Sequence, residues 1–458
     1  MKTVSFFNRH INRLINLSPT RVIVVYFTVL ITIGTCLLML PLSQKQGNST
    51  PLIDALFTST SAACVTGLVV YDTYNHWSTF GQVIILLLIQ LGALGIITLA
   101  TLFSVILGRK AGLKGMLLAR ESLSHFSFSE SMSIVKKVIF LSLSIELAGA
   151  AVLSIRFIPS FGLKGIYISV FHSISAFCNA GFDLMGISGK GNYVSLSGIS
   201  NDPLLIYTFS FLIIAGGLGF LVWNNIFNYR KTRVLLLNTQ LVLIITIFLI
   251  VFGAVLFFVF EMNNENTIGK MTLIEKINTS VFHSISPRTA GFNIIDLGAT
   301  KDITKVLNIL LMFIGAAPGS TAGGIKVTTI GILFMAVVSE IAGQPETVIL
   351  KKRVTYASII KSLTVIMLAF SLITIVSSLL LIIENKPYLQ VLFETTSAFG
   401  TVGLSTGLTP SLHVLSKILL IVTMFLGRVG LLTFAISLSL KNNKDRNSIY
   451  PEGKVVVG

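Results

Sequence analysis

Ser61-Ala62-Ala63-Cys64-Val65-Thr66-Gly67-Leu68 is the first of four copies of one short phrase. The other copies are Ser175-Ala176-Phe177-Cys178-Asn179-Ala180-Gly181-Phe182, Ser286-Pro287-Arg288-Thr289-Ala290-Gly291-Phe292 and Ser397-Ala398-Phe399-Gly400-Thr401-Val402-Gly403-Leu404. Their glycines lie 114, 110 and 112 residues apart, so four units of nearly equal length account for almost all of the 458 residues. The pattern predicts a fourfold repeat with one glycine turn in each unit.

The composition places these turns in a membrane. Hydrophobic residues make up 53% of the chain and charged residues 11%, and the mean hydropathy is +0.86. A soluble globule of this size would need far more polar surface. The formal net charge of +16 does not indicate nucleic-acid binding, because the basic residues are divided among the loops of an apolar chain. We therefore expect an all-α polytopic membrane protein.

Eight apolar stretches are long enough to cross a bilayer, which takes about 20 residues. They lie near 22–41, 80–107, 136–158, 203–227, 239–260, 303–340, 358–384 and 413–440. Shorter semi-apolar segments end in the four phrases, at 54–66, 168–180, 274–290 and 388–402. Because these are too short to span, each is expected to be a re-entrant half-helix followed by an extended strand. Each unit then reads span, half-helix, glycine turn, span.

The domain organisation follows from this unit. We expect four repeats around one pseudo-fourfold axis, at 22–107, 108–227, 228–340 and 341–440, between an N-terminal segment at 1–21 and a tail at 441–458.

Charge predicts the orientation. Basic residues occupy both termini and the segments between repeats, which by the positive-inside rule lie in the cytoplasm together with the termini. They are Lys2, Arg9, Arg13, Arg21, Arg109, Lys110, Lys114, Arg120, Lys136, Lys137, Arg230, Arg233, Lys231, Lys351, Lys352, Arg353, Lys441, Lys444, Arg446 and Lys454. The other side carries Asp54, Asp72, Asp183, Asp202, Glu265, Glu275, Asp296, Asp302, Glu384 and Glu394. The glycine turns should thus open outward, beneath an acidic vestibule that concentrates cations.

Four glycine turns around one axis suit a dehydrated monovalent cation. Such an ion needs oxygens in place of its hydration shell, and backbone carbonyls supply them where the strand adopts angles that favour glycine. The alternative is that each glycine only permits close helix packing. Four glycines in register, each preceded by a half-length segment and a serine, favour the ion filter. Neither HExxH nor a P-loop occurs, and Cys36, Cys64 and Cys178 lack metal-ligand spacing, so no enzyme is predicted.

The sixth stretch carries a second signal. Residues 303–340 would extend about 57 Å as one helix, nearly twice the hydrocarbon thickness. Its middle reads Gly315-Ala316-Ala317-Pro318-Gly319-Ser320-Thr321-Ala322-Gly323-Gly324-Ile325-Lys326. Proline and the glycines should break the helix, and unwound backbone at this depth is tolerated only against protein or a water-filled cavity. We expect this loop to line the pore below the filter; a plain kink between packed repeats is the alternative.

Several of these motifs together resemble a known family. The phrase Phe393-Glu394-Thr395-Thr396-Ser397 before Ala398, the phrase His283-Ser284-Ile285-Ser286-Pro287-Arg288 and the closing Tyr450-Pro451-Glu452-Gly453 are similar to the membrane subunit of bacterial Ktr potassium uptake systems, within the Trk/Ktr/HKT superfamily. The resemblance covers essentially the whole chain. It implies four membrane-pore-membrane repeats, a homodimer in the bacterial cell membrane with one pore per protomer, and a cytoplasmic nucleotide-binding (RCK/KTN-type) regulatory ring. Potassium is the implied ion, with sodium an open candidate activator.

The resemblance also assigns residues. The implied potassium filter is Val65, Thr66, Gly67, Asn179, Ala180, Gly181, Thr289, Ala290, Gly291, Thr401, Val402 and Gly403. The implied gating loop includes Gly315, Pro318, Gly319, Ser320, Thr321, Gly323, Gly324 and Lys326, and Arg428 of the last span matches the arginine that contacts it. In this superfamily a serine in place of the first filter glycine goes with sodium transport, so Gly67 favours potassium.

Three polar residues leave alternatives open. A cation within a cation filter would be repulsive, so Arg288 should point away, toward Asp296 or Glu275. Glu146 in the third span could serve as a proton or sodium relay, or pair with Ser142 or Ser144. A gated channel-like potassium uptake subunit is thus favoured, with a sodium- or proton-coupled potassium symporter as the alternative.

Overall fold

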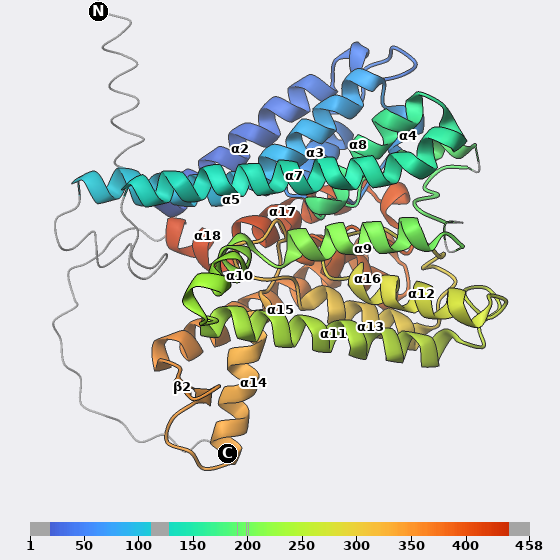
Figure 1. Cartoon of the computed structure of the whole chain (residues 1–458). Helices are drawn as coiled ribbons and strands as arrows, with labels where there is room; N and C mark the ends of the chain where they lie inside the picture. Colours follow the sequence, from blue (N-terminus) through green and yellow to red (C-terminus); the bar gives the residue numbers. More distant parts are fainter. Residues whose placement is uncertain (1–18, 111–127, 190, 198, 200, 439–458) are drawn as a thin grey trace, which may run out of the picture.

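The structure is a computed structural model that describes residues 19–110, 128–189, 191–197, 199 and 201–438. The expected N-terminal segment falls outside these residues almost entirely, as does most of the basic loop 109–120, and the tail 441–458 lies wholly outside them. Within the described part, the helices of regular secondary structure are accompanied by a single short two-stranded hairpin (Figure 1). The all-α prediction is confirmed.

The order of elements recurs four times along the chain. The first unit contains α2 (Pro19–Leu38), η1 (Pro41–Ser43), α3 (Leu52–Ala63), α4 (Thr73–His76) and α5 (Thr79–Lys110). The second contains α7 (Phe128–Phe161), α8 (Lys164–Phe177), η2 (Met185–Ser188), α9 (Pro203–Gly217) and α10 (Phe220–Thr232). The third contains α11 (Leu237–Glu261), α12 (Leu273–Ile285), α13 (Asp302–Phe313), α14 (Val327–Ile341), β1 (Val348–Ile349) and β2 (Lys352–Arg353). The fourth contains α15 (Tyr356–Glu384), α16 (Tyr388–Gly400), η3 (Thr409–Ser411), α17 (Val414–Val429) and α18 (Leu431–Leu438).

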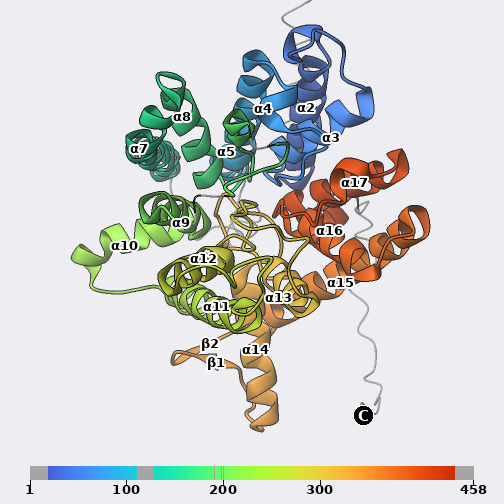
Figure 2. The same ribbon diagram turned by 90° about the vertical axis from the view of Figure 1, so that its right-hand side faces the viewer.

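The helices pack in a closed circuit around a centre that holds loops (Figure 2). The helix after each glycine turn contacts the short helix of the next unit: α5 contacts α8, α9 contacts α12, and α13 contacts α16. The circuit closes where α17 contacts α3, near the two ends of the described chain. The short helices α3, α8, α12 and α16 thus each lie between two units, with their glycine turns at the centre.

A phenylalanine anchors each short helix. Phe57, Phe171, Phe282 and Phe393 stand four residues before the serine of their phrase, and each is at most 1% exposed. Burial of one such side chain contributes about 2–3 kcal/mol. The repeated phrase therefore fixes the depth of the half-helix as well as the turn that follows it.

Helices occupy the stretches predicted as spans, but not all of these helices are continuous. Among the described residues, α2, α7, α11 and α15 are long and apolar enough to cross a membrane. The expected span 203–227 is instead two helices, α9 and α10, bent by 94°. Gly219 has a φ of +87° at this bend, and the following N–H of Phe220 donates to the carbonyl of Gly319. The stretch 413–440 likewise breaks at Gly430, where φ is +90°.

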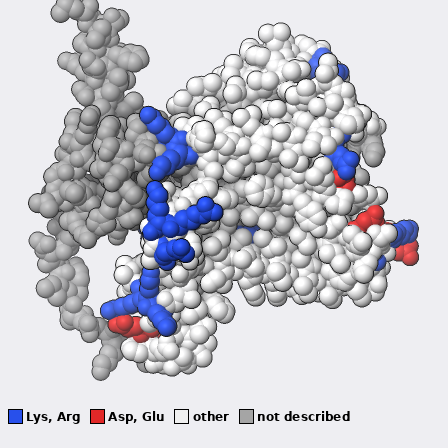
Figure 3. Space-filling view, viewed as in Figure 1, with Lys and Arg blue, Asp and Glu red and all other residues white. Residues whose placement is uncertain are grey.

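Charged side chains are concentrated at the two ends of the molecule. Lys and Arg form a band along one end of the view in Figure 3, at the end where α10 and the β hairpin lie in Figure 1. The described residues there include Arg230, Lys231, Arg233 and the segment 351–353, all exposed. Between the two ends, the face seen in Figure 3 shows almost no charge, as expected for a surface in contact with lipid.

Candidate functional site

The four glycine turns meet in a ring. A Cβ atom added at Gly67, Gly181, Gly291 or Gly403 would lie at most 3.0 Å from a backbone carbonyl oxygen of another turn. Those oxygens belong to Ala180, Ala290, Val402 and Thr66, in that order. Each turn therefore abuts the next, and the fourth returns to the first. No side chain larger than hydrogen fits at these four positions without moving the neighbouring strand.

The backbone of the four turns is alike. The first residue of each strand has a positive φ, at Val65 (58°), Asn179 (59°), Thr289 (77°) and Thr401 (50°). The glycine two residues later is positive again, with φ between +70° and +92°. A left-handed conformation is costly for branched residues such as valine and threonine, and such conformations cluster where a site demands them. The recurrence of this backbone conformation in all four turns is what four equivalent strands around one axis require.

The serine of each phrase braces its strand. Ser61 and Ser397 accept a hydrogen bond from the N–H of Gly67 and Gly403, each at 3.1 Å. In the other two turns the serine donates instead: Ser175 Oγ to the carbonyl of Phe182 at 2.7 Å, and Ser286 Oγ to the carbonyl of Phe292. A serine at the same position of the phrase thus fixes each of the four strands. Its hydroxyl donates the hydrogen bond in two strands and accepts it in the other two.

The chemistry of this centre suits a monovalent cation. The short helices end at the turns, so their negative dipole ends converge on the ring. The buried hydroxyls of Thr66, Thr289 and Thr401 have no hydrogen-bond partner among the described residues. Among those residues no cluster of three or more His, Cys, Asp or Glu side chains could hold a metal. The available ligands are neutral oxygens, which suit an alkali cation in transit rather than a resident transition metal.

The broken sixth stretch lies directly against the glycine-turn region. Its backbone N–H groups at Ala317 and Thr321 donate to the carbonyls of Gly217 and Gly216 in α9, at 3.0 and 3.3 Å. On the other side, a Cβ at Gly324 would lie 3.1 Å from the carbonyl oxygen of Gly400. The loop between α13 and α14 therefore passes between the second and fourth turns.

Two basic side chains, the buried Arg428 and the partly exposed Lys326, hold this loop. Arg428 in α17 donates to the carbonyl of Thr321 and, at 2.7 Å, to that of Gly92 in α5. Lys326 Nζ donates to the carbonyls of Ala322 and Gly323 at 2.7 and 3.1 Å. Arg428 is 4% exposed, so it joins the loop of the third unit to a helix of the first inside the protein.

Arg288 points away from the ring, but its predicted partners are wrong. Its guanidinium Nη2 donates to Thr246 Oγ1 of α11 at 3.3 Å, and neither Asp296 nor Glu275 forms an ion pair with it in the described structure. Glu275 instead completes a capping box with Thr272 at the start of α12. Because the Glu275 carboxylate accepts from the backbone at the start of α12, it does not pair with Arg288, whose partner is the Thr246 hydroxyl.

Glu146 also differs from the prediction. Gln90 Nε2 donates to both of its carboxylate oxygens at 3.1 Å, and Cys178 Sγ lies 3.9 Å from Oε1. Ser142 and Ser144 donate to carbonyls of their own helix, so the alternative in which Glu146 pairs with one of these serines is wrong. The carboxyl group lies between the first and second units, next to Cys178 at the start of the second glycine turn.

The sequence analysis missed one contact of the site. Lys417 Nζ in α17 lies 2.7 Å from Asp54 Oδ1 in α3, and both side chains are 11% exposed. Tyr71 donates to the second carboxylate oxygen at 2.7 Å. This ion pair joins the last unit to the first half-helix and closes the circuit. In the sequence, the available signal was the presence of Lys417 in the apolar stretch 413–440, where a basic side chain needs a partner.

Known proteins resemble the chain over nearly its whole length. A family model named TrkH and described as "Cation transport protein" matches residues 2–450. The Ktr system potassium uptake protein B of Bacillus subtilis (strain 168) is 41% identical over 445 residues, which cover 97% of this chain and 98% of that protein. The potassium/sodium uptake protein NtpJ of Enterococcus hirae is 38% identical over 448 residues, which cover 96% of this chain and 98% of that protein. The crystal structure of the potassium transporter TrkH from Vibrio parahaemolyticus shares the fold, with a TM-score of 0.72 at 18% identity over 93% of this chain and 86% of that one.

Proposed function

Because this chain belongs to the TrkH family of cation transport proteins, as a multi-pass membrane protein similar to Ktr subunits, we propose that it takes up potassium through a gated, channel-like pore in the bacterial cell membrane. The closed ring of four glycine turns carries this proposal. A ring of backbone carbonyls selects by the field and number of its oxygens and leaves the ion free to move on. The relatives named as potassium uptake proteins support potassium as the ion.

The filter in this proposal consists of the three residues that end each turn, from Val65 to Gly67 in the first. Their side chains differ between units while the glycine recurs, because only backbone carbonyls need to face the ion. The third turn is one residue shorter between Phe282 and Gly291 than the second turn is between Phe171 and Gly181. It also contains Arg288, whose side chain points away from the ring. The filter should therefore discriminate less strongly than four identical strands would.

The gate in this proposal is the loop between α13 and α14. With Lys326 and Arg428 bonded to its carbonyls, the loop blocks the path below the filter sterically and with positive charge. Opening requires the bond between Arg428 and Thr321 to break. A regulatory subunit would drive that step from the cytoplasmic side.

The cytoplasmic partner belongs to the same proposal. The exposed basic segments 230–233 and 351–353 lie together at one end of the molecule (Figure 3) and would form its docking face on each protomer of a homodimer. The names of the relatives speak of a Ktr system, which supports a multi-component assembly. The nucleotide-binding ring and the inward orientation of this face rest on the resemblance and on the positive-inside rule.

A coupled symporter is the second candidate. Glu146 is buried, and no basic side chain pairs with it among the described residues, so it could carry a proton or sodium ion between units. The Enterococcus hirae relative is named for potassium and sodium. Reconstituted protein separates the two mechanisms: uptake that follows the potassium gradient alone supports the channel, whereas uptake that stops without a sodium or proton gradient supports the symporter.

Rubidium uptake and growth on limiting potassium test the proposal, in a bacterial strain without its own potassium uptake systems. The chain should restore both, with a Ktr-type regulatory subunit present. Gly67→Ser and Gly291→Ser should abolish rescue or shift it toward sodium at equal membrane abundance. Rescue indifferent to both substitutions would mean that the glycines serve packing and that the filter assignment is wrong.

A further inference from the structure

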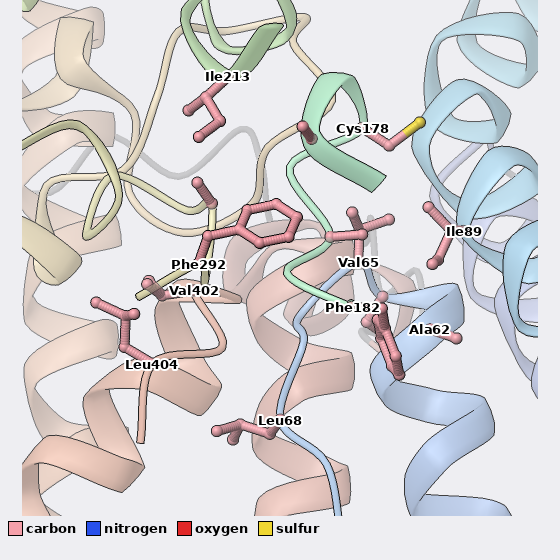
Figure 4. Close-up of a cluster of buried hydrophobic side chains, with 14 of the residues drawn as sticks. Ala62, Val65, Leu68, Ile89, Cys178, Phe182, Ile213, Phe292, Val402 and Leu404 are labelled. Carbon is pink, nitrogen blue, oxygen red and sulfur yellow. The ribbon is translucent and has the colours of Figure 1, made fainter. Parts of the chain in front are cut away.

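The side chains just outside the glycine ring alternate between buried and partly exposed positions. The residue after each glycine, Leu68, Phe182, Phe292 or Leu404, is at most 2% exposed and belongs to the cluster of buried hydrophobic side chains in Figure 4. In extended chain, successive side chains point to opposite sides. The next residue in each strand should therefore face the axis. Those residues are Val69, Asp183, Asn293 and Ser405, and all four are partly exposed.

Asp183 has no cationic partner among the described residues, in contrast to four other acids on the outer side. Ion pairs join Asp54 to Lys417, Asp202 to Arg156, Glu265 to Lys270 and Asp302 to Lys305, at distances between 2.7 and 3.4 Å. Asp183 Oδ1 accepts one hydrogen bond from the N–H of Met185 at 2.9 Å. No described basic side chain pairs with it. Its carboxylate is thus available two residues beyond the ring.

Asn293 occupies the same place on the neighbouring strand. A Cβ at Gly181 would lie 3.0 Å from Gly291 Cα, so the two strands touch directly below these side chains. Asn293 Nδ2 donates to the carbonyl of Ile295 at 3.2 Å, which leaves its amide oxygen without a hydrogen bond among the described residues. Ser405 is engaged, since it donates to Glu394 at 2.6 Å.

We propose that Asp183 and Asn293 form an outer monovalent-cation site, which binds the ion before it enters the glycine ring. This inference rests on the proposed function and adds a site made of side chains to a filter made of backbone. One carboxylate and one amide oxygen, completed by water, attract a monovalent ion yet release it. A divalent cation would require more carboxylate ligands. The nearby Asp72 does not supply one, because it accepts from the N–H groups of Asn75 and Tyr193.

Rubidium uptake over a range of external rubidium concentrations tests this site. Asp183→Asn keeps an oxygen for the Met185 N–H and removes the charge. It should raise the apparent KM roughly five- to tenfold at low ionic strength, with the maximal rate changed by less than about twofold, because a single charge near the mouth acts on ion capture. Adding Asn293→Asp should restore the KM, since the charge returns to the neighbouring strand. Asp296→Asn is the matched control, because Asp296 is an exposed outer acid that also accepts a backbone N–H, from Gly298.

A second readout is the pH profile. Burial and the neighbouring charge of Asp72 raise the pKa of Asp183 to about 7. Lys45 lies near Asp72, and the imidazole of His172 accepts from the N–H of Leu184 beside it. The carboxyl is charged above its pKa, so the wild-type KM should rise as external pH falls from 8 to 6. The KM of Asp183→Asn should stay constant over that pH range.

Three results would overturn the site: an unchanged KM in Asp183→Asn, an equal shift in Asp296→Asn, or no recovery with Asn293→Asp. If the wild-type chain transports no rubidium, the proposed function fails. The site is then judged by thermal stabilisation of the purified protein by potassium. That stabilisation should be larger for wild type than for Asp183→Asn, and equal stabilisation would refute it.

Discussion

Replacing Arg428 should open the pore. Arg428→Gln keeps much of the side-chain length but loses the charge and the bonds to the carbonyls of Thr321 and Gly92. The bond to Thr321 is the one that ties the gating loop to α17. A hydrogen bond from a charged group contributes about 1.5–3 kcal/mol, and each 1.4 kcal/mol shifts an equilibrium tenfold, so the open fraction should rise roughly 10- to 100-fold if the closed state dominates.

The assay is rubidium flux into proteoliposomes that contain the purified chain without a regulatory subunit. Arg428→Lys is the matched control, because it keeps the positive charge and should stay closer to wild type. Thermal unfolding in detergent verifies that each variant is folded, since the lost bond to Gly92 also joins two units. Flux equal to wild type in folded Arg428→Gln would refute the role of this arginine in closing the loop.

Three further predictions concern the supports of the site. Ser397→Ala removes the acceptor of the partly buried Gly403 N–H, which should cost about 0.5–1.5 kcal/mol; we expect a lower melting temperature and weaker discrimination of potassium from sodium, and unchanged values for both would contradict the brace. Asp54→Asn leaves Lys417 buried without its counter-charge, a loss of about 3–5 kcal/mol that a second change, Lys417→Met, should partly recover; thermal unfolding measures both, and no recovery would argue against the ion pair. Reversing the charges of segment 351–353 should weaken co-purification of the regulatory subunit in a salt-dependent manner, whereas unaffected binding would move the docking face elsewhere.

The order of elements could be predicted because span length and hydropathy are local properties of the sequence. The break at Gly315–Lys326 was predictable as well, since proline and several glycines fall together in one apolar stretch. The bends at Gly219 and Gly430 were not. A glycine in an apolar run is compatible with a packed helix, and Gly92, inside the continuous α5, is such a case. The bend at Gly219 depends on a carbonyl of the third unit, which local sequence does not reveal.

The contacts that assemble the site depend on tertiary structure. Asp54 and Lys417 are 363 residues apart, and nothing in either segment identifies the other as its partner. The partner of Glu146 was missed for the same reason, since Gln90 belongs to another unit. The glycine phrase was informative because it occurs four times, so that its register could be compared without any knowledge of the fold.

The most direct test of the central claim compares two glycines of the same turn region. Gly403 and Gly407 have nearly equal φ values, +90° and +95°, so alanine strains the backbone similarly at both. A Cβ at Gly403 would collide with the Thr66 carbonyl, whereas one at Gly407 meets no described atom within 4 Å. We would measure potassium and sodium flux through both alanine variants in proteoliposomes. The account predicts that Gly403→Ala loses potassium flux or its preference over sodium while Gly407→Ala keeps both. Equal behaviour of the two variants would contradict a filter built on the ring of glycine turns.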